Sequence, residues 1–239
     1  MAEKPLASEL KIMSAGALKA MVVALGAEFE RESGIVLDLN FGTAGAQGDR
    51  VKAGEATDLV MISQSGIQML DRLCLLKPAS PVDLASTVTG VIVRDGAPQP
   101  DISTPAAFKQ ALLDAPSVAW TDPKAGGSGG IMFVALLDRL GIADAINRKA
   151  VLCQGGHDVA VAIAEGRAVF ATTLISEALA VKGVTIVGPL PGDLNFKNMY
   201  SAAIHAGSTK TQAAQSFLDF LTAPATRPRW IAAGMEPAF

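Results

Sequence analysis

The spacing of apolar residues along this chain switches between the period of a strand and that of a helix. This switching predicts strands that are each followed by a helix. Residues 10–14 form a short apolar run, and from Ala17 to Glu32 apolar residues recur at every third or fourth position. Residues 35–41 then alternate between apolar and polar, which favours a half-buried strand. A turn and a short helix ending at Gly54 follow. The start of the chain therefore predicts two consecutive β-turn-α units.

The same alternation continues to the end of the chain. It predicts further strands at residues 59–62, 86–94, 117–121, 151–153, 168–173, 184–187 and 200–204. It predicts further helices at 67–73, 131–140, 159–165, 210–221 and 226–233, and another that opens at Thr104 and Pro105. Repeated alternation of strands and helices is typical of an α/β protein with a doubly wound, mostly parallel sheet.

The long strand at residues 86–94 leaves the first cluster of elements, and new β-loop-α units begin after it. We therefore predict two lobes, each with its own doubly wound sheet. The first lobe would contain residues 1–84 and 194–239, and the second residues 85–193. Two strands would cross between the lobes and serve as a hinge.

Charge and composition argue against nucleic-acid and membrane partners. The chain has 20 basic and 23 acidic residues, a formal net charge of −3, so no broad basic surface is expected. Aromatic residues make up only 5% of the chain, too few for a base-stacking platform. No uncharged apolar run approaches the roughly 18 residues of a transmembrane helix. We expect a monomer whose partner is a small molecule.

The two cysteines and two histidines restrict the available chemistry. Cys74 and Cys153 lie far apart in apolar runs without metal-ligand spacing, which favours two buried free thiols. The chain lacks a HExxH motif, a nucleophile elbow, a Walker A lysine and a GxGxxG fingerprint. We therefore expect no metal ion and no cofactor, and neither a hydrolase nor a metalloenzyme.

Four turns of small residues, at 14–17, 42–45, 126–130 and 155–158, each join a predicted strand to a predicted helix. In a parallel sheet such turns share one edge, where helix starts expose backbone N–H groups to anions. Any one of them is also what an ordinary helix start prefers. Together they predict a cleft that surrounds a small anion with uncharged donors. The candidate residues in these turns are Ser14, Gly16, Ala17, Thr43, Ala44, Gly45, Ser128, Gly129, His157 and Asp158.

The chain resembles the molybdate-binding family of periplasmic solute-binding proteins over nearly its whole length. The matching segments are residues 11–18, 41–45 with 54–59, Thr121-Asp122-Pro123 with Ser128-Gly129, and 186–191. The resemblance implies two α/β lobes, a two-strand hinge, and capture of an oxyanion by hydroxyl and amide groups.

Transfer of the family's ligand positions argues against molybdate itself. The resemblance puts the first ligand serine at Ala17, the next two contacts near Thr43 or Gly45 and near Ser128, a backbone contact at Val159 and a tyrosine hydroxyl at Leu174. Two hydroxyl donors are thus replaced by apolar side chains, which a desolvated tetrahedral dianion would not tolerate. We infer a small organic carboxylate or another oxyanion, with Ser14, Thr43, Ser128 and His157 as direct donors.

Two functions are compatible with this interpretation. The first is a solute-binding protein that serves an ABC-type transporter, with a membrane permease as partner. The second is a cofactor-free isomerase, because the sequence is also similar to a rarer branch, the aconitate isomerases. In that case His157 would be the catalytic base. Lys124, Lys197 and Tyr200 are additional candidate partners for ligand carboxylates.

Localisation has two interpretations. As written, the first residues contain no secretory signal, which indicates a cytoplasmic protein. The polar start also fits a periplasmic protein whose signal peptide has been removed.

Overall fold

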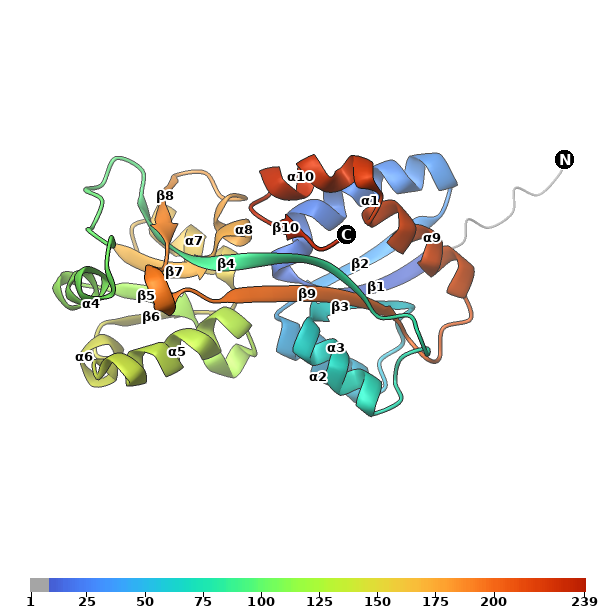
Figure 1. Ribbon diagram of the computed structural model, residues 1–239, viewed down its shortest axis with the longest axis horizontal. Coiled ribbons are helices and arrows are strands. Elements are labelled where there is room, and N and C mark those ends of the chain that lie inside the picture. The colour runs from blue at the N-terminus through green and yellow to red at the C-terminus, as the bar shows by residue number, and fades with distance from the viewer. Residues whose placement is uncertain (1–8) are drawn as a thin grey trace, which may run out of the picture.

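Ten strands and ten α-helices are present in residues 9–239, the part of the chain that the computed structural model describes (Figure 1). The predictions for residues 1–8 lie outside the described residues. The strands are β1 (Glu9–Ala15), β2 (Val36–Gly42), β3 (Leu59–Ser63), β4 (Val82–Arg94), β5 (Val118–Thr121), β6 (Ala150–Cys153), β7 (Phe170–Leu174), β8 (Val184–Pro189), β9 (Lys197–Ile204) and β10 (Glu236–Pro237). The helices are α1 (Lys19–Ser33), α2 (Ala44–Lys52), α3 (Gln64–Arg72), α4 (Pro105–Asp114), α5 (Ser128–Leu140), α6 (Ala143–Asn147), α7 (Gly156–Ala164), α8 (Ile175–Ala178), α9 (Thr211–Leu221) and α10 (Arg227–Ala232), with a 3-10 turn η1 (Gly16–Leu18) before α1. None of these helices combines the length and apolar character needed to cross a bilayer.

The first lobe is built on strands β2, β1 and β3, which are parallel, with β9 antiparallel beside β3. Helices cover both faces of this sheet, with α1, α9 and α10 on one side and α2 and α3 on the other (Figure 1). Helix α1 buries the apolar stripe expected from its periodicity, and its Phe29 ring lies 5.0 Å from that of Phe217 in α9. The helix ends at Gly34, whose φ of 72° is the left-handed conformation of a helix C-cap.

The second lobe is built on β6, β5 and β7, again parallel, with β4 antiparallel to β7 and β8 antiparallel to β4. Its main core packs Trp120 of β5 against Phe133 of α5, with ring centroids 5.3 Å apart. Small residues of α7 form a separate core on the other face. Both lobes are therefore doubly wound α/β units, as the sequence predicts.

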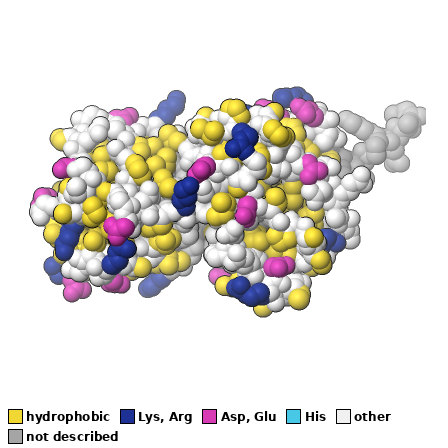
Figure 2. Space-filling model, in the orientation of Figure 1, with side chains coloured by type: hydrophobic (Ala, Val, Ile, Leu, Met, Phe, Trp, Pro, Cys, Tyr) yellow, Lys and Arg dark blue, Asp and Glu magenta, His cyan; other side chains and the backbone are white. Residues whose placement is uncertain are grey.

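Strands β4 and β9 connect the two lobes (Figure 1). The first half of β4 pairs with β9 in the first lobe, and its second half pairs with β7 and β8 in the second. The space-filling view shows the lobes as two masses joined at a narrower waist, with basic and acidic side chains scattered over the visible face (Figure 2). The division at residues 84 and 193 stays a prediction, and Leu194 and Phe196 still pack in the core of the second lobe.

Several boundaries differ from the prediction. Helices α5 and α7 each begin three residues earlier than expected, at Ser128 and Gly156, because their glycines are helical rather than part of a loop. The short helices α6 and α8 were not predicted, since neither is long enough to show a period. Cys153 is buried as expected, but Cys74 is exposed at a left-handed turn with φ of 58°.

Candidate functional site

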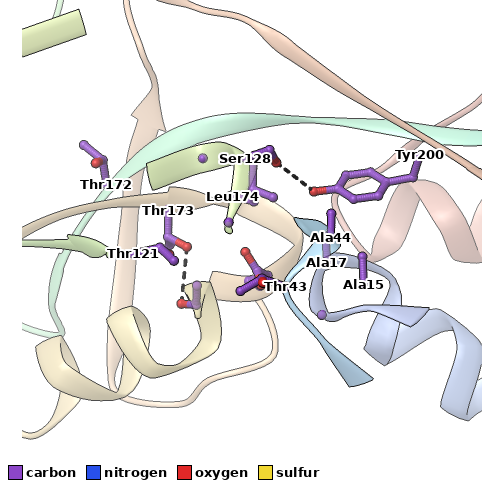
Figure 3. A pocket seen from close by; sticks show the side chains of 15 residues that line it. Ala15, Ala17, Thr43, Ala44, Thr121, Ser128, Thr172, Thr173, Leu174 and Tyr200 are labelled. Carbon is purple, nitrogen blue, oxygen red and sulfur yellow. Dashed lines mark hydrogen bonds between the residues drawn. The ribbon is translucent and has the colours of Figure 1, made fainter. Parts of the chain in front are cut away.

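A cavity lies between the lobes and takes residues from both (Figure 3). Its free volume is about 30 Å³, room for a few water molecules at most, within about 390 Å³ of space that is not filled by atoms and is partly open to solvent. The first lobe and β9 contribute Ala15, Gly16, Ala17, Thr43, Ala44 and Tyr200. The second lobe contributes Thr121, Gly127, Ser128, Gly129, Gly156, Thr172, Thr173, Leu174 and Glu177.

Four helix starts meet at this cavity, one from each of the predicted turns. They belong to η1 with α1, to α2, to α5 and to α7. The first N–H groups of a helix have no partner within the helix, and the dipole makes its start positive. Two starts come from each lobe, so the cavity can bring both sets of donors to one small anion.

Glycines at the start of α5 let the helix lie directly against β5. A Cβ added at Gly130 would lie 2.0 Å from the backbone oxygen of Thr121, and one added at Gly127 would lie 2.6 Å from the Thr121 Cγ2. Neither contact can be accommodated without moving the chain. Packing against β5 therefore explains why part of the segment 126–130 consists of glycine, and it brings Ser128 to the cavity.

The two lobes are in contact beside the cavity through an interlobe latch made of Thr43, Gly45, Ala125 and Gly126. The Gly45 N–H donates to the Gly126 backbone oxygen at 2.9 Å, and the Thr43 hydroxyl donates to the backbone oxygen of Ala125. A Cβ added at Gly45 would lie 2.7 Å from the Gly126 oxygen. The latch therefore requires glycine at position 45 and holds the structure in a closed arrangement.

Hydroxyl groups supply further uncharged donors. Tyr200 of β9 and Ser128 of α5 place their hydroxyl oxygens 3.5 Å apart across the lobes (Figure 3). Burial raises the pKa of Tyr200, so this phenol stays a neutral donor. The Thr173 hydroxyl donates to the Gly156 oxygen at 3.2 Å. The Thr172 hydroxyl is buried and has no partner within the described residues, which leaves it free for a ligand.

Among residues 9–239, the carboxyl group of Glu177 in α8 is the one acidic side chain in the cavity lining, and no Lys, Arg or His lines it. This carboxyl group is partly buried and lies against two glycines. A Cβ added at Gly156 would lie 1.9 Å from its Oε2, and one added at Gly16 would lie 3.2 Å from its Oε1. Loss of hydration and, to a smaller extent, the nearby Asp158 raise the pKa of Glu177 to about 7, although a hydrogen bond from the Gly156 N–H lowers it. The group can therefore be neutral or charged near neutral pH.

The cavity brings together eight of the residues predicted from the sequence. They are Gly16, Ala17, Thr43, Ala44, Ser128, Gly129, Leu174 and Tyr200. Ala17 and Leu174 present apolar side chains to it, which leaves the site with both polar and apolar walls.

Three predicted contacts have their donor groups engaged elsewhere. The hydroxyl of Ser14 is buried and donates to the Ala15 oxygen at 3.3 Å. The Val159 N–H donates to the Gly155 oxygen at 3.1 Å, and the Gly45 N–H belongs to the interlobe latch. None of the three lines the cavity.

His157 and Asp158 also lie outside the cavity lining. Because α7 begins at Gly156 rather than Val159, both residues fall in its first turn and their side chains are exposed. Lys124 is exposed as well, and Lys197 donates to the Glu236 carboxylate at 2.5 Å. The predicted base and the two additional cations are thus not placed at the cavity.

The sequence interpretation missed Glu177 and the threonines at the ends of β5 and β7. Thr121, Thr172 and Thr173 close strands that were predicted, so their position at the carboxyl end of a parallel strand could have identified them. Glu177 had no such signal, because α8 was not predicted.

Comparisons with known proteins agree with this architecture. A curated relative, an aconitate isomerase from a Pseudomonas species, is 29% identical over 235 residues, which cover 95% of this chain and 87% of that protein. The periplasmic molybdate-binding protein of Azotobacter vinelandii has a similar structure, with a TM-score of 0.78, 16% identity and coverage of 95% of this chain and 98% of that one. The sulfate-binding protein of Mycobacterium tuberculosis has a TM-score of 0.74, 21% identity and coverage of 97% and 87%. Because the two solved structures are only 16% and 21% identical to this chain, their similarity to it shows a shared fold.

The family comparison covers nearly the whole described chain. Residues 10–236 match the family described as bacterial extracellular solute-binding protein. The span contains both lobes, the two crossing strands and every residue that lines the cavity. The chain belongs to this family of bacterial extracellular solute-binding proteins.

Proposed function

We propose that this protein captures a small organic carboxylate or oxyanion in the cavity between its lobes. The observation that carries the proposal is the meeting of four helix starts, two from each lobe, at a cavity that the described residues line with hydroxyl groups and with no cationic side chain. Backbone N–H groups at helix starts stabilise an anion without a counter-charge. Because both lobes contribute donors, an anion would favour the closed arrangement over the open one.

The walls of the cavity favour an organic anion over a small inorganic one. Ala15, Ala17, Ala44 and Leu174 form an apolar part of the lining beside the hydroxyl groups. A desolvated tetrahedral oxyanion needs a donor for nearly every oxygen, and apolar walls leave some unpaired. A carboxylate on a carbon skeleton can use both kinds of wall.

Calorimetric titration tests the proposed function. The panel contains trans-aconitate, smaller di- and monocarboxylates, sulfate and molybdate, with the trimethyl ester of aconitate as an uncharged control. We expect one carboxylate molecule bound per chain and no binding of the ester. Equal binding of acid and ester, or no binding of any anion, would contradict the proposal.

The free hydroxyl of Thr172 leads to a first prediction. Replacing Thr172 with valine removes a donor that has no partner among the residues described, so the melting temperature should stay within about 2 °C of the wild type. Affinity for the best carboxylate should fall about tenfold, because a hydrogen bond to a charged group is lost. Thr89→Val is the matched control, since that hydroxyl is also buried without a partner but does not line the cavity. Equal affinities of the two variants would exclude Thr172 as a ligand donor.

A second candidate function is isomerisation of a small unsaturated polycarboxylate. The observation that favours it is the Glu177 carboxyl group in the cavity, since a double-bond shift needs a base that removes a proton from carbon and returns it to another carbon. The substrate loses one C–H bond and gains another, so atoms and electrons balance without a cofactor. The similarity to an aconitate isomerase supports the same candidate.

Ultraviolet absorbance of trans-aconitate solutions distinguishes the two candidates. Isomerisation would change the spectrum with time, whereas a binding protein would shift its own melting temperature without turnover. If turnover occurs, Glu177→Gln should reduce it at least 100-fold by removing the base. His157→Ala should retain it, because that side chain is exposed outside the cavity. The reverse pattern would restore His157 as the catalytic base.

The family also suggests a cellular role. We infer a periplasmic location and delivery of the captured anion to a membrane permease by a monomeric protein, in keeping with membership of an extracellular solute-binding family. Detection of the protein in the periplasmic fraction of its native cells tests the location, and copurification with a permease tests the partner.

A further inference from the structure

We propose that Glu177 couples anion binding to proton uptake, so that the cavity accepts its ligand only with the Glu177 carboxyl group in the neutral form. This inference rests on anion capture as the proposed function. It is incompatible with the isomerase candidate, because a base must be ionised while the substrate is bound. It makes Glu177 the residue that sets the pH range of binding and the charge of the ligand that fits.

The position of the carboxyl group is the first argument. Its Oε2 lies against the Cα of Gly156 at the start of α7, and its Oε1 lies near Gly16 at the start of η1. These are two of the four helix starts that would hold the anion, one from each lobe. In the absence of ligand the carboxyl group therefore occupies part of the space in which an anion would be stabilised.

Electrostatics supply the second argument. An ionised carboxylate beside a bound anion places two like charges in a partly desolvated space, and such pairs raise the pKa of one member strongly. In the part of the chain that the structure describes, no Lys, Arg or His lines the cavity to offset the second charge. A neutral carboxyl group removes the repulsion and supplies an O–H donor to the anion. Proton uptake is thus the change that makes Glu177 compatible with the ligand.

Among the described residues, the other titratable groups on the elements packed against α8 lie outside the cavity lining. The elements packed against α8 are η1, β4, β7, β8 and α7. Among them η1, β7 and β8 carry no titratable side chain, α7 begins with His157 and Asp158, and β4 carries Asp83 and Arg94 near its two ends. Asp83 accepts from Gln64 and Ser201, away from the cavity, and Arg94 closes β4 next to the Gly166 turn. Tyr200 faces Glu177 from β9 as a neutral phenol.

The direction of the pH dependence follows from these groups. The pKa of Glu177 is about 7 without ligand, and a bound anion raises it further. Below pH 6 the group is neutral in both states, so affinity should not change with pH. Above pH 7 each binding event takes up one proton, and affinity should fall by up to tenfold per pH unit.

Calorimetric titration with trans-aconitate between pH 5.5 and 9 tests the inference. This anion keeps a constant charge over most of this range, because carboxyl groups titrate near pH 4. We expect an affinity plateau at low pH and a fall of at least tenfold between pH 7 and 8.5. Binding heats in two buffers of different ionisation enthalpy should show uptake of about one proton per anion at pH 8, a readout that needs no variant.

Two variants sharpen the test. Glu177→Gln keeps the shape of the neutral carboxyl group, so it should bind at least tenfold more tightly than the wild type at pH 8.5, with no pH dependence. Asp158→Asn removes a charge that raises the pKa of Glu177, so its affinity should begin to fall at a lower pH than in the wild type. A wild-type affinity that is flat with pH, or tighter binding at pH 8.5 than at pH 6, would overturn the inference while leaving anion capture intact.

A ligand-free measurement separates failure of the inference from failure of the proposed function. Folding raises the pKa of Glu177 from 4.5 to about 7, so its contribution to stability is complete below pH 4.5 and is lost as the pH rises to 7. The melting temperature of Glu177→Gln should therefore rise relative to the wild type between pH 5 and 8. Constant relative stability would overturn the inference even if no probe bound. Absence of binding by every anion at every pH would instead contradict the proposed function.

Discussion

Replacing Gly45 with alanine is expected to weaken anion binding by about 10- to 100-fold while leaving the protein folded. The added Cβ would lie 2.7 Å from the backbone oxygen of Gly126 and 2.9 Å from its Cα, in the opposite lobe. Backbone atoms cannot yield as a flexible side chain can, and such overpacking commonly costs about 1–3 kcal/mol. The lobes would separate at the interlobe latch instead, so the penalty falls on the closed arrangement that binds the ligand.

Gly48→Ala is the matched control for this prediction. Gly48 lies in the same helix, α2, and a Cβ there would contact only the Ile62 Cδ1 at 3.5 Å, an ordinary distance. Alanine favours a helix over glycine by about 1 kcal/mol, so both variants should be at least as thermally stable as the wild type. Calorimetry should show weak binding for Gly45→Ala alone, and X-ray scattering should show a larger radius of gyration in the presence of ligand. Equal affinities of the two variants would mean that closure at the interlobe latch is not required for binding.

Replacing Gly130 with alanine is expected to destabilise the second lobe by about 3 kcal/mol. The added Cβ would lie 2.0 Å from the backbone oxygen of Thr121 and 2.9 Å from its backbone carbon, within one lobe. Opening of the lobes cannot relieve this contact, so α5 must move away from β5 and disturb the packing of Trp120 on Phe133. For a chain of this length the loss corresponds to a fall in melting temperature of roughly 6–12 °C.

Gly129→Ala separates this packing effect from the general effect of a side chain at the helix start. A Cβ at Gly129 would lie 3.8 Å from the Leu174 Cγ, an ordinary contact, so its melting temperature should stay within about 2 °C of the wild type. Thermal unfolding followed by circular dichroism measures both variants. A small change for both would show that α5 and β5 are less tightly packed than the distances indicate.

The sequence was sufficient to predict most of the fold, because strand and helix periods are local properties. The strand at residues 59–62 and the helix at 211–221 show their periods without help from distant residues. The meeting of the four turns was also predictable, since the carboxyl ends of parallel strands share one edge. The crossing of two strands between the lobes was predicted from the long strand at residues 86–94, which leaves the first cluster of elements.

The boundaries of the helices at the cavity could not be predicted because tertiary contacts decide them. Glycine disfavours helices, so the glycines around Ser128 and Gly156 indicated loops. In the structure Gly129, Gly130 and Gly156 are helical. Glycine is needed at two of these positions because a side chain at Gly130 would meet Thr121 and one at Gly156 would meet Glu177. The three-residue shift at α7 is what moved His157 from the predicted site to the exposed surface.

The importance of Glu177 could not be predicted from its own segment. Nothing in residues 174–181 indicates a buried carboxyl group, and α8 is only four residues long. Its position depends on Gly16 and Gly156, which are distant in sequence and lack the side chains that would fill the space. Only the assembled structure brings a titratable group to the helix starts.

A crystal structure of the protein with the carboxylate that binds most tightly in the calorimetric panel tests directly whether helix starts from both lobes hold the anion. We expect one ligand molecule between the lobes, with carboxylate oxygens about 3 Å from N–H groups at the starts of η1, α2, α5 and α7 and from the Thr172 hydroxyl. A ligand bound elsewhere, or one in the cavity whose charge is met by Lys or Arg side chains instead of these helix starts, would contradict it.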